Sequence, residues 1–276
     1  MKNIIDNLDG LNGFRKVLLL YSGGVDSTYA LLHCLKNNIE VVAFRGIDSL
    51  NQTPDRIKKF LAQQNVKLVE KDSSLELVES FISKGILTGG FYQNRFPISS
   101  SYTRPLIAKY ATTIAIDENC ECIIHTSNFH QNSAARFNNA VMHFAPNLPL
   151  AIPYINSTVT REEKLKTLFE AGYEIEGSIY SIDQNLWCRV IENGDLDDIK
   201  NPTKENHFLW TRYNANCNDE RTLSLGFMNG LPVSINGVFF KLKDLISELN
   251  NIGKILQIGR FNGLEDTQKK KKNHEV

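Results

Sequence analysis

The chain has 276 residues, 42% hydrophobic and 22% charged, so it is long enough for one large or two modest domains whose cores need no disulfide or metal support. Its 31 basic residues balance its 31 acidic ones, which argues against a broad basic surface for nucleic acid. Residues 1–13 contain no long apolar run, so we expect neither a signal peptide nor a membrane anchor, but a folded cytoplasmic protein.

Short apolar runs alternate with helical patterns in the first part of the chain. Strands are predicted at residues 16–21, 40–44 and 66–70, and helices at 29–35 and 55–64. Regular alternation of this kind predicts a parallel sheet covered on both faces.

The alternation continues to about residue 171. We expect helices at 105–116, with Pro105 in the first helical turn, at 134–144 and at 161–171. Strands are predicted at 122–125 and 150–153.

The pattern changes after Tyr173. Short strands at 178–182, 222–228 and 231–235 precede a helix at 242–252, which indicates a separate α+β unit. The predicted fold class is therefore α/β, with a parallel-sheet nucleotide-binding domain followed by a smaller α+β domain. We place an ATP-binding domain at residues 1–172, a substrate-binding domain at 173–265 and a flexible basic tail at 266–276.

The five cysteines are scattered, apart from Cys120 and Cys122. This pair cannot easily close on itself and lacks metal-ligand partners at a recognised spacing. We expect both to be buried, reduced thiols in a strand.

The segment between the first predicted strand and helix carries the chemistry. It reads Tyr21-Ser22-Gly23-Gly24-Val25-Asp26-Ser27-Thr28. Exposed backbone N–H groups and the helix dipole favour a phosphate there, the glycines let it approach closely, and Ser22, Ser27 and Thr28 add hydroxyl donors. Asp26 is poorly placed as a phosphate ligand, so we assign it to Mg²⁺ or to ordering the loop. The alternative is an ordinary helix start, because serine and aspartate are good caps.

This loop lacks the lysine of Walker-type loops, which disfavours simple γ-phosphate transfer. It resembles the loop of the ATP pyrophosphatase superfamily, whose adenine nucleotide alpha hydrolase (PP-loop, HUP) domain is shared by NAD synthetase, asparagine synthetase and several tRNA-modifying enzymes. The resemblance implies cleavage between the α- and β-phosphates.

Further blocks in chain order are similar to argininosuccinate synthase. They are residues 95–109 (family R-Y-x-x-G-T-x-x-A-R-P-x-I-A-K), 125–137 with 145–148, 180–187 (S-x-D-x-N-L-W), 230–237 (G-x-P-V-x-x-N-G) and 259–265 (G-R-I-D-x-V-E). That family adenylates the ureido oxygen of citrulline and lets the amine of aspartate displace AMP. The resemblance implies ATP and Mg²⁺ as cofactors and small amino acids as substrates, with no nucleic-acid or membrane partner.

The resemblance also implies site residues, position by position. Catalytic roles fall on Ser22, Asp26 and Arg104, with Asp26 as the magnesium ligand. ATP would be bound by Tyr21, Ser22, Gly23, Gly24, Asp26, Ser27, Thr28, Gly46 and Thr126. Substrates would be bound by Phe96, Ser100, Ser101, Asn128, Asn132, Ser133, Arg136, Ser181, Val190 and Glu265.

Three of these residues receive specific roles. Arg136 would pair with a substrate carboxylate, Ser181 would add a hydroxyl contact, and Glu265 would meet the α-ammonium group. Without the resemblance, Arg136 would be interpreted as a surface helix residue and Glu265 as an ordinary exposed acid.

Departures from the family concentrate where it recognises its second substrate. The family's T-G-K-G-N-D is replaced by residues 128–133, of which only Asn132 is retained. Phe96 takes the place of a tyrosine and Val190 that of a serine. His130, in the altered segment, is either a general base or a polar surface residue. The family continues past the position of Glu265 into an oligomerisation helix, so we expect a monomer or homodimer rather than a tetramer.

The sequence therefore predicts an AMP- and pyrophosphate-forming carbon–nitrogen ligase similar to argininosuccinate synthase. Three alternatives stay open: a divergent paralogue with a different amino-acid acceptor or nucleophile, an RNA- or nucleobase-modifying relative, and a non-catalytic nucleotide-binding or regulatory homologue. The neutral charge and the absence of a convincing cysteine pair argue against the RNA-modifying enzyme.

Overall fold

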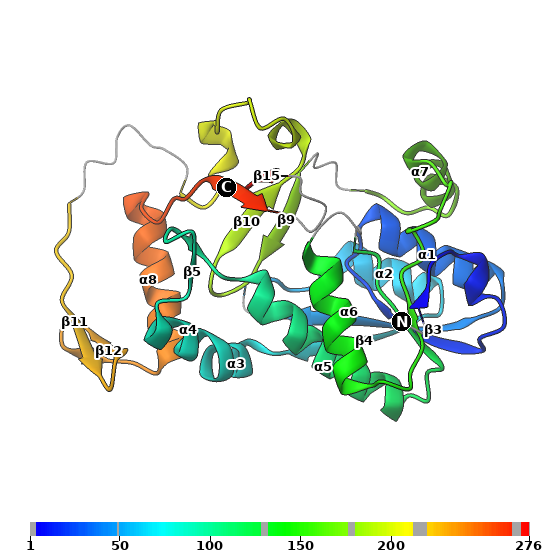
Figure 1. Cartoon of the computed structure of the whole chain (residues 1–276), viewed down its shortest axis with the longest axis horizontal. Coiled ribbons are helices and arrows are strands. Elements are labelled where there is room, and N and C mark those ends of the chain that lie inside the picture. The colour runs from blue at the N-terminus through cyan, green and yellow to red at the C-terminus, as the bar shows by residue number, and fades with distance from the viewer. Residues whose placement is uncertain are drawn as a thin grey trace. The chain divides into compact units, whose positions relative to one another are not determined.

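The computed structural model describes residues 4–48, 50–127, 132–175, 180–211, 220–266 and 272–275. The chain packs into two compact units (Figure 1). The first comprises Met1–Ile47, Gln52–Ser73 and Thr103–Gly177, and the second Asp48–Asn51, Ser74–Tyr102 and Ser178–Val276. The domain boundaries expected at residues 172 and 265 stay predictions.

A six-stranded parallel sheet forms the centre of the first unit. Its strand order is β1-β8-β7-β2-β3-β4. The strands are β1 (Ile4–Ile5), β2 (Lys16–Leu20), β3 (Glu40–Ile47), β4 (Lys67–Asp72), β7 (Cys122–Ile124) and β8 (Leu150–Ala151). All except β1, which was not expected, lie where the sequence predicted a strand.

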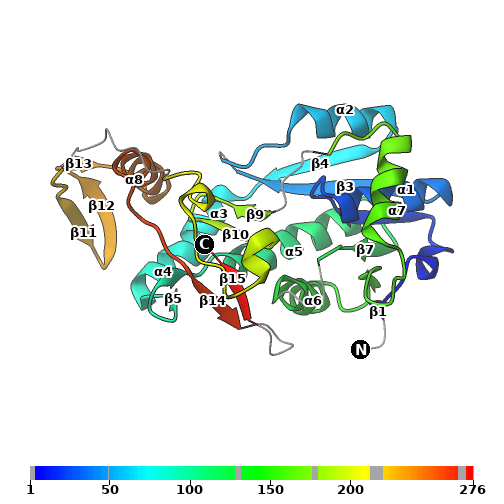
Figure 2. The same ribbon diagram turned by 90° about the horizontal axis from the view of Figure 1, so that it is seen from above.

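Alternate side chains of these strands enter two separate cores. Val17 and Leu19 face one core and Leu18 the other. The first core is covered by α1 (Val25–Lys36), α2 (Asp55–Gln63) and α7 (Arg161–Glu170), and the second by α5 (Ser100–Asp117) and α6 (Asn132–Phe144). Figure 2 shows these two groups of helices on opposite sides of the sheet. Each fully buried leucine stabilises the fold by about 1.5–3 kcal/mol.

Local sequence explains how α2 packs and how α7 begins. Helix α2 buries Ile57, Phe60 and Leu61, which share one face because they are three and four residues apart. Helix α7 begins at a capping box in which the Thr160 side chain accepts from the Glu163 N–H at 3.2 Å and the Glu163 carboxylate accepts from the Thr160 N–H at 2.7 Å.

The start of α5 differs from the prediction. The helix was expected to begin at Pro105, but it begins at Ser100 and holds Pro105 in its interior. A proline at this position removes one helical hydrogen bond and disfavours helical geometry at Arg104. Burial of Leu106, Ala108 and other side chains against the sheet offsets that cost.

The second unit is built from short antiparallel strands and helices. Its strands are β5 (Phe91–Tyr92), β6 (Phe96–Pro97), β9 (Ser181–Gln184), β10 (Arg189–Glu192), β11 (Leu225–Met228), β12 (Leu231–Ile235), β13 (Val238–Phe239), β14 (Gly263–Asp266) and β15 (Lys272–Glu275). Its helices are α3 (Ser74–Leu77), a π-helical segment at Val78–Ile82, α4 (Ser83–Thr88), 3₁₀ turns at Gly194–Asp197 and Glu205–His207, and α8 (Leu242–Leu256). The first unit adds a 3₁₀ turn at Asp9–Leu11.

Several elements of this unit were not expected. The strand predicted at 178–182 is β9, which begins at Ser181, and residues 176–179 lie outside the described ranges. The helical region Ser74–Thr88 and strands β5, β6, β10, β13, β14 and β15 had no counterpart in the prediction. Lys272, expected in a frayed tail, begins β15, which pairs with β14.

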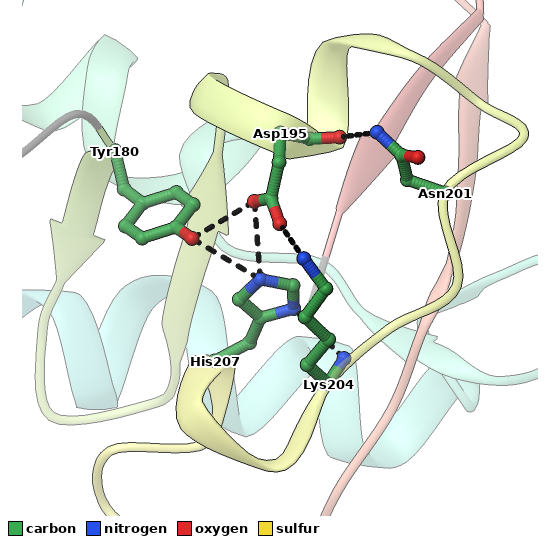
Figure 3. A network of polar contacts seen from close by, with 5 residues as sticks. All are labelled: Tyr180, Asp195, Asn201, Lys204 and His207. Carbon is green, nitrogen blue, oxygen red and sulfur yellow. Dashed lines mark hydrogen bonds and ion pairs between the residues drawn. The ribbon is translucent and has the colours of Figure 1, made fainter.

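A network of polar contacts surrounds the buried His207 side chain (Figure 3). The Asp195 carboxylate accepts from the Tyr180 hydroxyl at 2.8 Å, lies 3.2 Å from His207 Nε2, and pairs with the Lys204 ammonium at 2.5 Å. His207 Nδ1 accepts the backbone N–H of Lys204 at 3.1 Å, so Nε2 carries the ring proton. Asn201 donates to the Asp195 carbonyl oxygen. These contacts hold residues 180–207 of the second unit together.

The expected burial of the cysteine pair is confirmed. Cys120 and Cys122 are buried, as is Cys34 on α1. Burial raises the pKa of Cys120 to about 11 and the pKa values of Cys34 and Cys122 to about 12.

Because these thiols are buried, we expect the free energy of unfolding to fall at alkaline pH. Their stabilisation is complete below about pH 9, where the unfolded chain also keeps its thiols protonated, and it falls as the pH rises towards the folded-state pKa values. Each thiol lowers the free energy of unfolding by about 1.4 kcal/mol per pH unit in that window. Urea denaturation between pH 8 and 11 should show this decline, and the slope should be shallower by that amount in Cys122→Ala. An unchanged slope in the variant would contradict the assignment.

None of the helices in the described ranges has the length and apolar character needed to cross a membrane.

Candidate functional site

The predicted phosphate loop lies where parallel sheets usually bind ligands. From β2 the chain passes to β3 and β4 on one side, and then returns to β7 on the other side of β2. The carboxyl ends of β2 and β7 therefore flank a topological switch point, which is the usual ligand-binding position in such sheets. Residues 21–28 follow β2, and His125 and Thr126 follow β7.

The loop geometry suits a phosphate. Gly23 has φ +76°, a left-handed conformation that favours glycine. The Ser22 and Ser27 hydroxyls lie 2.9 Å apart, the Gly24 N–H donates to Ser22 Oγ at 3.2 Å, and Ser27 Oγ donates to the Gly24 carbonyl at 3.1 Å. Gly24 is the N-cap of α1 and places no side chain over the helix end. The positive end of α1 is thus left open to an anion.

Tyr21 and Thr28 support the loop from inside. Both side chains are buried, and their hydroxyls are hydrogen-bonded to each other at 3.0 Å. The buried hydroxyl of Tyr173 donates to the Gly23 carbonyl at 2.6 Å. The Tyr173 contact holds the Gly23 carbonyl, and the Tyr21–Thr28 pair ties the start of the loop to α1.

Arg45 on β3 is a functional candidate that the sequence reading missed. Its Nη1 donates to the carbonyl oxygens of Tyr21, at 3.3 Å, and Ser22. Burial lowers the pKa of Arg45, and its Nε is buried without a hydrogen-bond partner among the described residues. A charged donor that engages two loop carbonyls leaves the loop N–H groups to face a phosphate. The strand pairing of β2 with β3, rather than any motif, brings Arg45 to the loop.

We expect Arg45→Met to weaken ATP binding roughly tenfold, because a charge-assisted hydrogen bond contributes about 1.5–3 kcal/mol. The free energy of unfolding should change little, since methionine fills much of the space and removes the cost of burying a charge. Isothermal titration with ATP and urea denaturation measure the two effects. Arg15→Met is the matched control, because Arg15 forms an exposed ion pair with Glu121. Equal ATP affinities in both variants would exclude this role.

The Asp26 side chain is about half exposed, and it is already paired with other residues of the chain. Its carboxylate pairs with the Lys164 ammonium at 2.7 Å, and its carbonyl accepts from the Tyr154 hydroxyl at 2.7 Å. Lys164 has a side chain only 11% exposed, and its Nζ lies 3.6 Å from the centroid of the Tyr154 ring. This geometry fits the loop-ordering role of Asp26 better than the magnesium role.

The described residues fit a phosphate but provide no magnesium site of their own. In those ranges, no group of three or more histidine, cysteine, aspartate or glutamate side chains is placed to hold a metal ion. A magnesium ion here would need oxygen ligands from the nucleotide and from water.

The other predicted residues of the first unit lie on three elements. Gly46 is on β3, and a Cβ there would lie 3.2 Å from Ile107 Cγ1 of α5. Arg104, on α5, has its guanidinium carbon 5.5 Å from the Phe137 ring centroid. Asn132, Ser133 and Arg136 occupy the first turns of α6, where Asn132 and Arg136 share a face. Asn128 lies outside the described residues.

His125 follows β7, but its side chain is buried and does not act as a proton carrier. It is fully buried, donates from Nε2 to Asn138 Oδ1 at 2.7 Å, and has its pKa lowered by burial to about 4. It is therefore neutral near pH 7. His130, the histidine considered as a base, lies outside the described residues.

The second unit brings two pairs of predicted substrate residues together. Phe96 and Glu265 line one cavity of about 60 Å³ with Tyr92 and Gln93. Ser181 and Val190 lie on the β9–β10 hairpin, where the register places their side chains on the same face. Ser100 and Ser101 are the first residues of α5.

Comparison with known families decides the classification. Residues 16–174 match the family model described as the arginosuccinate synthase N-terminal HUP domain, and residues 180–276 match the arginosuccinate synthase C-terminal domain. The chain belongs to the argininosuccinate synthase family. The domain that contains the parallel sheet is thus of the HUP type, and a smaller domain with antiparallel strands follows it. This confirms the predicted fold class.

Curated relatives share the family name. Argininosuccinate synthase of Pyrococcus furiosus is 32% identical over 267 residues, which cover 95% of this chain and 64% of the relative. That of Pyrobaculum aerophilum is 32% identical over 272 residues, covering 96% and 68%. The chain thus spans about two thirds of the length of these relatives. A solved 4-thiouridine synthetase–RNA complex with bound ATP is 15% identical, covers 57% of this chain and 41% of its own, and has a TM-score of 0.41, too small a likeness to support a conclusion.

Proposed function

We propose that the chain is an ATP-dependent carbon–nitrogen ligase of the argininosuccinate synthase type. It uses ATP to adenylate a citrulline-like ureido oxygen, with release of pyrophosphate. A nitrogen nucleophile, aspartate or another amine, then attacks the activated carbon and displaces AMP. Small amino acids are the substrates, and the cytoplasm is the proposed location.

The geometry of the loop carries this proposal. A left-handed Gly23, hydroxyls at Ser22 and Ser27, and an open α1 N-terminus lie together at the switch point of a HUP-type sheet. The loop binds the phosphates through backbone N–H groups and contains no lysine. This matches displacement of pyrophosphate as a unit rather than transfer of the terminal phosphoryl group.

The substrate roles follow from residue chemistry. Arg136, on the first turns of α6, presents a planar fork of donors to a substrate carboxylate. Glu265 and Phe96 line a cavity of about 60 Å³ together with Arg95, and Glu265 is the group there that would meet a substrate ammonium. Arg104 stabilises charge on the transferred group, and Thr126, Gly46 and the loop hold the nucleotide.

A changed nucleophile is the second candidate, and residues 128–133 favour it. Only Asn132 is kept from the family pattern there, and Ser133 stands in place of an acid. Loss of a charged contact to aspartate costs about 1.5–3 kcal/mol, so aspartate would bind poorly through this segment.

Substrate-dependent pyrophosphate release tests the proposal. The protein is incubated with ATP, Mg²⁺ and citrulline, with and without aspartate, and a second series replaces aspartate with other amines. Release that requires both amino acids supports argininosuccinate formation. Repeated turnover with citrulline and another amine, but not with aspartate, supports the changed nucleophile. A single equivalent of pyrophosphate with citrulline alone reports only the adenylation step, which both candidates share. No release with any pair, together with no measurable ATP binding, would exclude the ligase.

A further inference from the structure

The second unit contains a pocket in which Phe96 is, among the described residues, the one that was assigned to substrate binding above. Its volume is about 460 Å³, within the range of small-molecule sites. Its walls include Trp187, Trp210, Phe208 and Phe261, so both tryptophans of the chain line it. Aromatic walls of this kind bind flat or branched apolar groups.

Two buried donors in the pocket lining lack partners. Trp187 Nε1 and Arg189 Nε are buried and make no hydrogen bond to any described residue. Within the same ranges Arg189 has no carboxylate partner, and its guanidinium carbon lies 5.9 Å from the Trp210 ring centroid. Buried donors without acceptors are unfavourable, and a ligand that supplies oxygen atoms would satisfy them.

The remaining charges of the lining are positive. Lys254, on α8, is exposed, and Arg260 is held by the Glu205 carboxylate at 2.9 and 3.0 Å. Arg260 also covers the Phe208 ring at 4.9 Å, so it forms part of the wall. His207 belongs to the Asp195 network (Figure 3) and is committed there. Among the described residues that line the pocket there is no aspartate or glutamate.

From these contacts we propose that the pocket binds a small amphipathic monoanion, an aromatic or branched-chain carboxylate. The carboxylate is held by Arg189 and the Trp187 indole N–H, and the apolar body packs against Trp210 and Phe208. An ammonium ligand would meet only like charges, and a neutral ligand would leave the Arg189 charge uncompensated. The proposal rests on the second unit alone and is independent of ATP chemistry.

Three probes that share the same apolar group distinguish an anionic, a neutral and a cationic ligand. 3-Phenylpropanoate, 3-phenylpropanol and 3-phenylpropylammonium differ only in the end group, and they are titrated without ATP while tryptophan fluorescence is recorded. Because both tryptophans line the pocket, their emission reports binding there. We expect the carboxylate to bind at least tenfold more tightly than the alcohol, and the ammonium to bind more weakly than either.

Arg189→Met then tests the assigned contact. It should reduce the affinity for the carboxylate to that for the alcohol and leave the alcohol unchanged. Arg161→Met, at the start of α7 in the first unit, is the charge-matched control and should behave as the wild type. Equal binding of carboxylate and alcohol to the wild type, no fluorescence response to any probe, or full carboxylate affinity in a folded Arg189→Met would each overturn the proposal. If Arg189→Met does not fold, the three titrations of the wild type still test whether the pocket prefers the carboxylate.

Discussion

Gly23→Ala should abolish ATP-dependent pyrophosphate release and lower the free energy of unfolding by about 2–5 kcal/mol. Two effects add. The alanine would have to adopt φ +76°, which costs about 1–2 kcal/mol, and its Cβ would lie 2.2 Å from Ile57 Cδ1 and 3.2 Å from the Tyr173 hydroxyl. Relieving that overlap costs about 1–3 kcal/mol more. It also moves the backbone that approaches the phosphate, so ATP affinity falls with stability.

Gly172→Ala is the matched control. Gly172 follows α7 with φ +73°, and a Cβ there would meet no atom within 4 Å. The control therefore shows the backbone cost alone, about 1–2 kcal/mol, with normal ATP affinity. Urea denaturation and ATP titration of both variants give the comparison. If Gly23→Ala were no less stable than Gly172→Ala and bound ATP normally, the described loop geometry would be wrong.

Asp26 and Lys164 should act as one unit in holding the loop. Asp26→Asn leaves the nearly buried Lys164 ammonium without its anion, at a cost of about 1–3 kcal/mol in unfolding free energy. Lys164→Met keeps an apolar stem against Tyr154 and should cost about 1 kcal/mol. Both variants should weaken ATP binding several-fold. The double variant should be less destabilised than the sum of the single variants, by about 1 kcal/mol.

The same variants distinguish the two roles assigned to Asp26. Loop ordering predicts that Asp26→Asn and Lys164→Met weaken ATP binding alike, without changing the Mg²⁺ concentration needed for half-maximal pyrophosphate release. A magnesium ligand predicts that only Asp26→Asn raises that concentration. Lys166→Met is the control on the same helix, because Lys166 and Glu170 form an exposed pair at 3.9 Å. Additive losses in the double variant would contradict the coupling.

The sequence located the loop and most of the sheet because both depend on local signals. An apolar run, two glycines and a helical period are contiguous in residues 16–35, and β2 and α1 form there. The start of α5 was missed for the opposite reason: proline usually marks a helix boundary, and tertiary burial of the residues that follow Pro105 overrode that preference.

The support of the loop could not be predicted, because its residues are distant in sequence. Arg45 lies 24 residues from Tyr21, and Lys164 lies 138 residues from Asp26. Neither belongs to a motif, and only strand pairing and helix packing bring them to the loop. In the second unit, the cavity that joins Phe96 to Glu265 likewise depends on strands β6 and β14, neither of which was expected.

The most direct test of the central claim, that this loop cleaves ATP between its α- and β-phosphates, is to identify the nucleotide product. ATP labelled in the adenine ring is incubated with the protein, Mg²⁺, citrulline and a set of amines, and the products are separated by chromatography. We expect AMP in amounts equal to pyrophosphate, and no AMP with Gly23→Ala. ADP with inorganic phosphate as the products would contradict it.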